Sequence, residues 1–270
     1  MNALLGYLDT YRAHFQVYIA VQLQYRAALA IWLIGMVLEP VIYLVVWATV
    51  ARSSGGQVAG YTGGDFAAYF IAMMLVNHLT FSWIMHDFEF RIRKGEFSPR
   101  LLRPIHPIHA DIADNITYKL LTAPVMLPAA VVLGLVFHPS WHLTPGTVLA
   151  FVPSLVLGFA VRFVVEWVLA LAAFWTTRVD AINQMYFVGL LFLSGRLAPL
   201  TLFPWPVQAA AAVSPFRWMM SFPVEVLLGR LSTQDIMFGL AAQAAWVGIS
   251  LLILGGVWQV GVKRYTAVGA

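Results

Sequence analysis

The chain has 270 residues, of which 61% are hydrophobic and only 10% are charged, and its mean hydropathy is +0.80. A water-soluble domain carries about 25% charged residues, so this composition excludes a soluble fold and indicates a protein embedded in a lipid bilayer. The formal net charge of +4 gives no reason to expect a nucleic-acid partner, because in a membrane chain the positions of the basic residues matter more than their sum.

The first 25 residues predict an amphipathic helix that lies at the membrane interface and does not cross the bilayer. Apolar side chains such as Leu8 and Phe15 recur at helical spacing, and Asp9 and Arg12 interrupt them. The apolar run that follows is about twice as long as the apolar core of a signal peptide. A cleaved leader is therefore not expected.

Six stretches are apolar enough to cross a membrane, which takes about 20 residues in a helix. They are residues 27–51, 66–86, 116–137, 147–174, 183–203 and 237–260. With the N-terminus inside, eleven of the sixteen Lys and Arg residues fall on the inner side and four on the outer side. Cytoplasmic loops retain positive charge. The sequence therefore predicts an all-α polytopic membrane protein, a single domain over residues 1–270, with both termini cytoplasmic.

The segment from 195 to 230 interrupts this regular pattern. It contains five prolines, which prevent one continuous helix. Irregular backbone is tolerated at membrane depth only where it is buried in protein or lines water. We expect a broken, partly re-entrant pair of short helices on the outer side, between the fifth and sixth spans.

The longest predicted inner loop, residues 87–115, carries charges of both signs. It can be a solvated connector whose arginines only hold the topology. It can also be a docking element, since a short helix bounded by Gly95 and Pro104, with apolar Leu101 and Leu102 beside basic residues, offers a surface that a soluble partner can bind.

Four strings carry a resemblance to a known family. They are IRKGEFSPRLLRP at Ile92–Pro104, GRLAPLTLFP at Gly195–Pro204, SPFRWMMSFPVEVLLGRLS at Ser214–Ser232 and KRYTAVGA at Lys263–Ala270. Together, and in this order, they resemble the bacterial ABC-2 type transporter permeases, in particular the small six-span branch that works beside a separate ATPase subunit. The likeness covers nearly the whole chain.

The resemblance implies the permease half of an exporter in the bacterial cytoplasmic membrane. Such a subunit pairs with a second permease, related or identical, and docks two copies of an ABC ATPase. In that family the N-terminal helix and the loop after the second span form the ATPase-facing surface, and the re-entrant helices face outside. The residues expected to couple to the ATPase here are Arg93, Gly95, Glu96, Leu101, Leu102, Arg103 and Pro104.

Motifs for catalysis and metal binding are missing from the sequence. A phosphate-binding loop ends in Gly-Lys-Ser/Thr, but none of the three lysines follows a glycine. We therefore expect no enzyme and no cofactor in this chain, with ATP and Mg²⁺ bound by the partner ATPase. The pairs His106/His109 and His138/His142 lie near prolines with no clear third ligand, so no metal site is expected.

Four of the polar residues within the predicted spans, Glu39, Asn77, Arg162 and Glu166, are candidate functional residues, because ionisable and strongly polar groups are costly there and mark either function or a buried pair. Arg162 and Glu166 are four residues apart, on one helical face, and can neutralise each other. Glu39 precedes Pro40 and either sits in a polar interface or pairs with Arg162, while Asn77 suits a hydrogen bond between helices.

A rival interpretation uses the same charges differently. An ion-coupled secondary transporter would bind its coupling ion at Glu39, Arg162 and Glu166. Such transporters are built from internal repeats, and the two halves of this chain show none. A third possibility is a structural or assembly membrane protein with no transport role. The identity of what binds the 87–115 loop separates these classes.

Overall fold

Five helical segments in the computed structural model, which describes residues 2–176 and 179–265, are long and apolar enough to cross a membrane. They are α2 (Arg26–Ser53), α3 (Gly63–Thr80) followed after a break by α4 (Ile84–Arg93), α6 (Ile108–Phe137), α7 (Pro145–Ala170) with the 3₁₀ turn η1 (Leu171–Phe174), and α11 (Thr233–Arg264). The fifth predicted span, residues 183–203, corresponds to a shorter helix, α8 (Asp180–Leu193).

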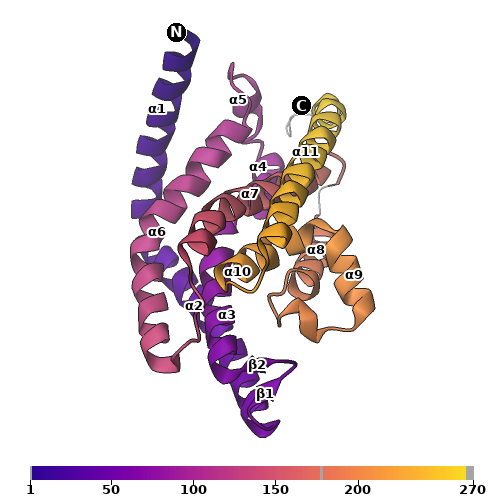
Figure 1. The fold of residues 1–270 in the computed structure, drawn as a ribbon. Coiled ribbons are helices and arrows are strands. Elements are labelled where there is room, and N and C mark those ends of the chain that lie inside the picture. Colours follow the sequence, from indigo (N-terminus) through magenta and orange to yellow (C-terminus); the bar gives the residue numbers. More distant parts are fainter. Residues whose placement is uncertain (1, 177–178, 266–270) are drawn as a thin grey trace.

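The N-terminal segment is helical over nearly its predicted length, as α1 (Asn2–Gln24). It packs against the first turns of α6, where the Tyr11 hydroxyl lies 2.9 Å from Nδ1 of His109 and the Gln22 amide donates to Asp114 at 3.1 Å. Figure 1 places the start of α1, the short helix α5 (Ser98–Leu101) and the end of α11 at the same end of the molecule. The prediction that α1 lies in the membrane interface stays a prediction.

The opposite end carries a small hairpin of β1 (Gln57–Val58) and β2 (Tyr61–Thr62) (Figure 1). Thr62 then begins α3 with a capping box, in which its side chain and that of Asp65 each bind the other's backbone N–H. Asp65 also pairs with Arg230 at 2.7 Å. This ion pair fixes the start of α3 to the segment that precedes α11.

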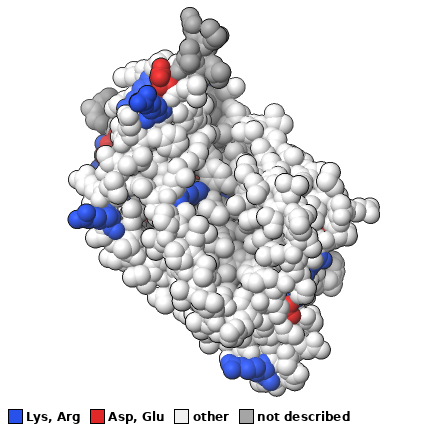
Figure 2. Space-filling model, turned by 60° about the vertical axis from the view of Figure 1, so that its left-hand side comes forward, with Lys and Arg blue, Asp and Glu red and all other residues white. Residues whose placement is uncertain are grey.

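Helix α3 lies at the centre of the molecule, and most of its side chains are buried. By contrast, only 17% of the most apolar window of each of α2, α6 and α11 is buried, and the remaining residues there are half-buried or exposed. Figure 2 shows a broad face on which Lys, Arg, Asp and Glu are sparse. Exposed helices of this composition are suited to contact with lipid, and the chain is a multi-pass membrane protein.

The segment after the fifth predicted span is broken into short pieces, as its prolines require. Helix α8 ends at Leu193 and not near 203, and its 14 residues reach only about 21 Å. Gly195 adopts φ +79°, and the Tyr69 hydroxyl donates to its carbonyl at 2.7 Å. The pieces that follow are η2 (Leu200–Leu202), α9 (Trp205–Val213), the π-helical η3 (Arg217–Ser221) and α10 (Phe222–Leu227). Their re-entrant placement stays a prediction.

More than half of the predicted inner loop 87–115 is helical in the structure. Residues up to Arg93 belong to α4, and residues from Ile108 onward form the first turns of α6. The charged run folds as a helix because Asp87–Arg91 and Glu89–Arg93 form i,i+4 ion pairs, both at 3.4 Å. Only residues 94–107, with α5 inside them, connect the two helices.

Candidate functional site

The second span is interrupted at residues 81–83, although the sequence there contains neither proline nor glycine. Side chains from neighbouring helices stabilise the interruption. The ammonium group of Lys119 donates to the carbonyl of Phe81 at 2.8 Å, and the Ser82 hydroxyl donates to Glu166. Backbone groups freed inside a membrane protein must find such partners, so α6 and α7 hold the broken helix in place.

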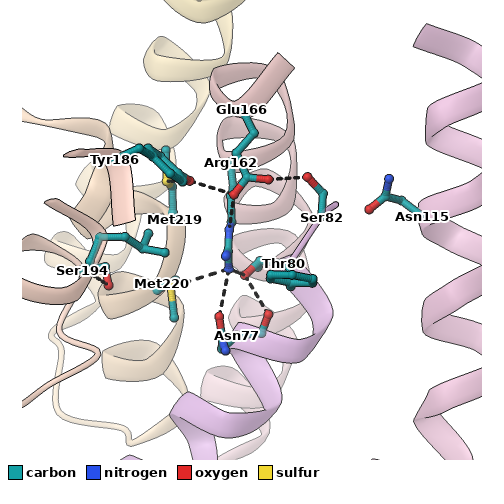
Figure 3. Close-up of polar contacts among 12 residues, drawn as sticks. Asn77, Thr80, Ser82, Asn115, Arg162, Glu166, Tyr186, Ser194, Met219 and Met220 are labelled. Atoms are coloured by element: carbon teal, nitrogen blue, oxygen red, sulfur yellow. Dashed lines mark hydrogen bonds and ion pairs between the residues drawn. The ribbon is translucent and has the colours of Figure 1, made fainter. Parts of the chain in front are cut away.

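A membrane charge cluster lies beside this break, formed by Asn77, Thr80, Ser82, Arg162, Glu166 and Tyr186 (Figure 3). Nε of Arg162 donates to Glu166 at 2.8 Å, and its Nη1 donates to Asn77 and Thr80 at 3.0 and 3.1 Å. Tyr186 donates to the same carboxylate at 2.8 Å. The spacing-based prediction therefore places Arg162 and Glu166 correctly on one face. Remote polar groups bind both side chains, while Nη2 of Arg162 is buried without a hydrogen-bond partner among the described residues.

Glu39 does not join this cluster. Its carboxylate pairs with the guanidinium of Arg196, from the turn after α8, so the suggested pairing with Arg162 is wrong. The reason is that Asn77 and Thr80 from α3 already hold Arg162 against α7. The three residues of the secondary-transporter hypothesis are thus divided between two separate ion pairs.

A second polar network, the Asp111 hub, fixes the segment between α4 and α6. Asp111 is buried and accepts hydrogen bonds from Arg91 at 2.7 Å, Arg100 at 3.4 Å and the Trp167 indole at 3.2 Å. These donors come from α4, α5 and α7. Because Trp167 directly follows Glu166, helix α7 belongs to both networks and connects them rigidly.

The predicted coupling residues occupy different environments around α5. Gly95 turns the chain with φ +73°, which favours glycine. Leu101 is half-buried against the aromatic cluster that contains Phe97, whereas Leu102 is 86% exposed. The others lie near the surface: Arg93 pairs with Glu89, Glu96 is exposed, and Arg103 and Pro104 line a groove.

The family model described as "ABC-2 family transporter protein" matches residues 37–269, which is most of the chain. The protein belongs to the ABC-2 transporter family. No curated protein matches this sequence. The match confirms the resemblance drawn from the four sequence strings and makes this chain an ABC-2 permease, a membrane transport component.

The groove on this ABC-2 permease lies between α1 and residues 103–105 and has a volume of about 570 Å³. Its lining comes from Asp9, Thr10, Ala13, His14, Val17, Arg103, Pro104 and Ile105. Burial, together with the nearby Arg103 and Arg100, lowers the pKa of His14. The imidazole is therefore mostly neutral at pH 7, and Asp9 and Arg103 supply the charge in the groove.

Several residues of the two networks, of the break at 81–83 and of the Glu39 ion pair are absent from the sequence-based predictions. They are Thr80, Ser82, Asp111, Lys119, Trp167, Tyr186 and Arg196. Lys119 could have been recognised from the sequence, since it lies only a few residues inside an apolar helix, where a cation needs a partner. In the part of the chain that the structure describes, no three His, Cys, Asp or Glu residues are grouped to hold an ion, and the expectation that the histidine pairs bind no metal stays a prediction.

Proposed function

We propose that this ABC-2 permease is the membrane subunit of an ATP-driven exporter in a bacterial cytoplasmic membrane. It forms the translocation path as a dimer, with an identical or related permease, and docks two copies of a separate ATPase at the end that carries α1 and α5. Six crossings, with α8 and the turn after it as the fifth, place both termini on the cytoplasmic side.

The proposal is supported most strongly by one contrast around α5. Leu102, directly after α5, projects as an exposed apolar side chain, while α5 itself is held to the membrane core through Arg100 and the buried Asp111. A soluble partner that binds Leu102 and the neighbouring groove would therefore push on α4, α6 and α7 together. A flexible loop, by contrast, would not transmit the movement of the partner to these helices.

The path of such a movement leads to the broken second span. Trp167 is bonded to Asp111 in the hub, and the adjacent Glu166 accepts the hydrogen bond of Ser82 at the break. A displacement of the hub would therefore move Ser82 through α7. In the proposed cycle, closure of the ATPase pair shifts α4 relative to α3 and opens a path along α2.

The docking role is tested by Leu102→Asp, with Leu143→Asp as the matched control. Leu143 is 50% exposed and belongs to the loop between α6 and α7, which Figure 1 shows at the lower end of α6, away from α5. Each variant is extracted gently from the native membrane, captured by affinity, and its bound proteins are identified by mass spectrometry. We expect the wild type and Leu143→Asp to retain a P-loop ATPase, and Leu102→Asp to lose it.

An undiminished ATPase yield with Leu102→Asp would show that the docking surface is elsewhere. Recovery of the wild-type chain alone, with transport driven only by an ion gradient, would reject the exporter and favour the secondary transporter. Leu101 is less suitable for this test because it also packs against the aromatic cluster.

A further inference from the structure

Two pockets lie next to each other along α2. The inner pocket, about 610 Å³, opens between the end of α1, the start of α2, α4 and α6. The middle pocket, about 470 Å³, lies further along α2 and reaches the Glu39–Arg196 pair. Each volume is in the range of sites for small organic molecules. Trp32 and Trp83 line both pockets and thus form the boundary between them.

The inner pocket combines carboxylates with aromatic rings. Asp87, Glu96 and Asp114 line it together with one basic residue, Arg91. Its aromatic lining residues are Tyr18, Tyr25, Trp32, Trp83, Phe90 and Tyr118. Aromatic faces attract organic cations, more strongly where water is excluded.

The charges in the inner pocket are not balanced. The closest ion pair of Arg91 is with Asp111, at 2.7 Å, and Asp87 lies further from it, at 3.4 Å. Asp114 accepts a hydrogen bond from the neutral amide of Gln22 and forms no ion pair with any residue in the described ranges. A half-buried carboxylate beside aromatic rings is left without a cation of its own.

We propose that the inner pocket is the loading site for the transported molecule, and that this molecule is an amphipathic organic cation. This proposal rests on the proposed exporter function and adds the substrate class. The cationic group lies near Asp114, and the apolar body lies against Tyr18, Trp32 and Trp83. An inorganic cation fits poorly, because a hard ion needs more oxygen ligands than this pocket gathers.

The Trp32–Trp83 pair controls passage to the middle pocket. The ring centroids are 4.8 Å apart and the rings meet edge to face at 72°. Trp83 is held by a second edge-to-face contact with Phe81, at 4.9 Å, whereas Trp32 is 54% exposed. Trp32 is therefore the ring that swings aside. Beyond it, Glu39 offers the next carboxylate to the cation, beside Phe187 and His86.

The test measures binding to the purified full-length permease in zwitterionic lipid nanodiscs, with no ATPase present. The probes are tetraphenylphosphonium and its anionic counterpart of nearly the same shape, tetraphenylborate. We expect saturable binding of the phosphonium and none of the borate. Asp114→Asn should raise the Kd for phosphonium by at least about tenfold, and Asp114→Glu should restore it.

Two further variants separate this site from general effects of charge or packing. Asp180→Asn removes one exposed carboxylate outside the pocket and should leave the Kd unchanged. Trp32→Ala should weaken binding about three- to tenfold, whereas Trp32→Phe should keep most of it. Retained thermal unfolding temperatures will show that each variant is folded.

Equal binding of the two probes, or an unchanged Kd for Asp114→Asn, would overturn the proposal. These outcomes are independent of ATPase docking. A permease that captures its ATPase but binds no organic cation would remain an exporter with a different substrate.

Discussion

Two ion pairs at membrane depth differ in how far they are buried. The side chains of Arg162 and Glu166 are 0% and 2% exposed and are tied to Asn77, Thr80, Ser82 and Tyr186. The side chains of Arg196 and Glu39 are 25% and 34% exposed and line a pocket. A charge enclosed by fixed partners stabilises one arrangement of helices, whereas a charge that borders open space can exchange its partner. The first pair is suited to structure and the second to transport.

Breaking the buried pair should have the largest effect. Removing one member of a buried ion pair leaves the other charge uncompensated, at a cost of about 3–5 kcal/mol. We expect Arg162→Met and Glu166→Gln each to lower the stability of the protein by that order, with Ser82 and Asn77 losing their partners. Unfolding in mild detergent, followed by Trp fluorescence, measures this.

The double variant Arg162→Met/Glu166→Gln serves as the control for that prediction. It removes both charges, so it should be more stable than either single variant. If the single variants unfold like the wild type, the cluster does not hold α3 to α7. If the two single effects simply add, the residues do not act as a pair.

Disrupting the Asp111 hub should have the second-largest effect on stability. Asp111→Asn removes the charge opposite Arg91 and Arg100 while keeping the shape, and losing hydrogen bonds to charged groups costs about 1.5–3 kcal/mol. We expect residues 94–107 to be cleaved faster by protease and ATPase activity to lose its coupling to transport. Limited proteolysis with mass spectrometry identifies the cleavage sites.

Asp87→Asn is the matched comparison for the hub. Asp87 binds the same arginine at 3.4 Å, but its side chain is 44% exposed, so the loss should stay below about 1 kcal/mol. Equal protease sensitivity in the two variants would mean that the hub does not anchor α5 more than a surface ion pair does.

The sequence was sufficient for features that depend on near neighbours. Long apolar runs predict α2, α6, α7 and α11, and the spacing of Arg162 and Glu166 predicts their shared face. Local information also indicates that the proline-rich segment after α8 is broken into short pieces.

Features stabilised by remote residues could not be predicted in the same way. The break at 81–83 has no local cause, since Lys119 and Glu166 stabilise it from other helices. Arg196 meets Glu39 across 157 positions in the chain. The loop predicted at 87–115 is largely helical because its charges pair along α4 and with Asp111, which a count of charged residues does not reveal.

Breaking the partly exposed Glu39–Arg196 pair should have the smallest effect on stability and a clear effect on transport. Glu39→Gln removes a partly exposed ion pair, which contributes about 0–1 kcal/mol, so unfolding should change little. Transport of tetraphenylphosphonium into inside-out vesicles should fall, because the middle pocket loses its carboxylate. Glu39→Asp should retain transport. A large loss of stability in Glu39→Gln would place this pair with the buried one and remove the contrast, whereas unchanged transport would mean that the cation does not pass Glu39.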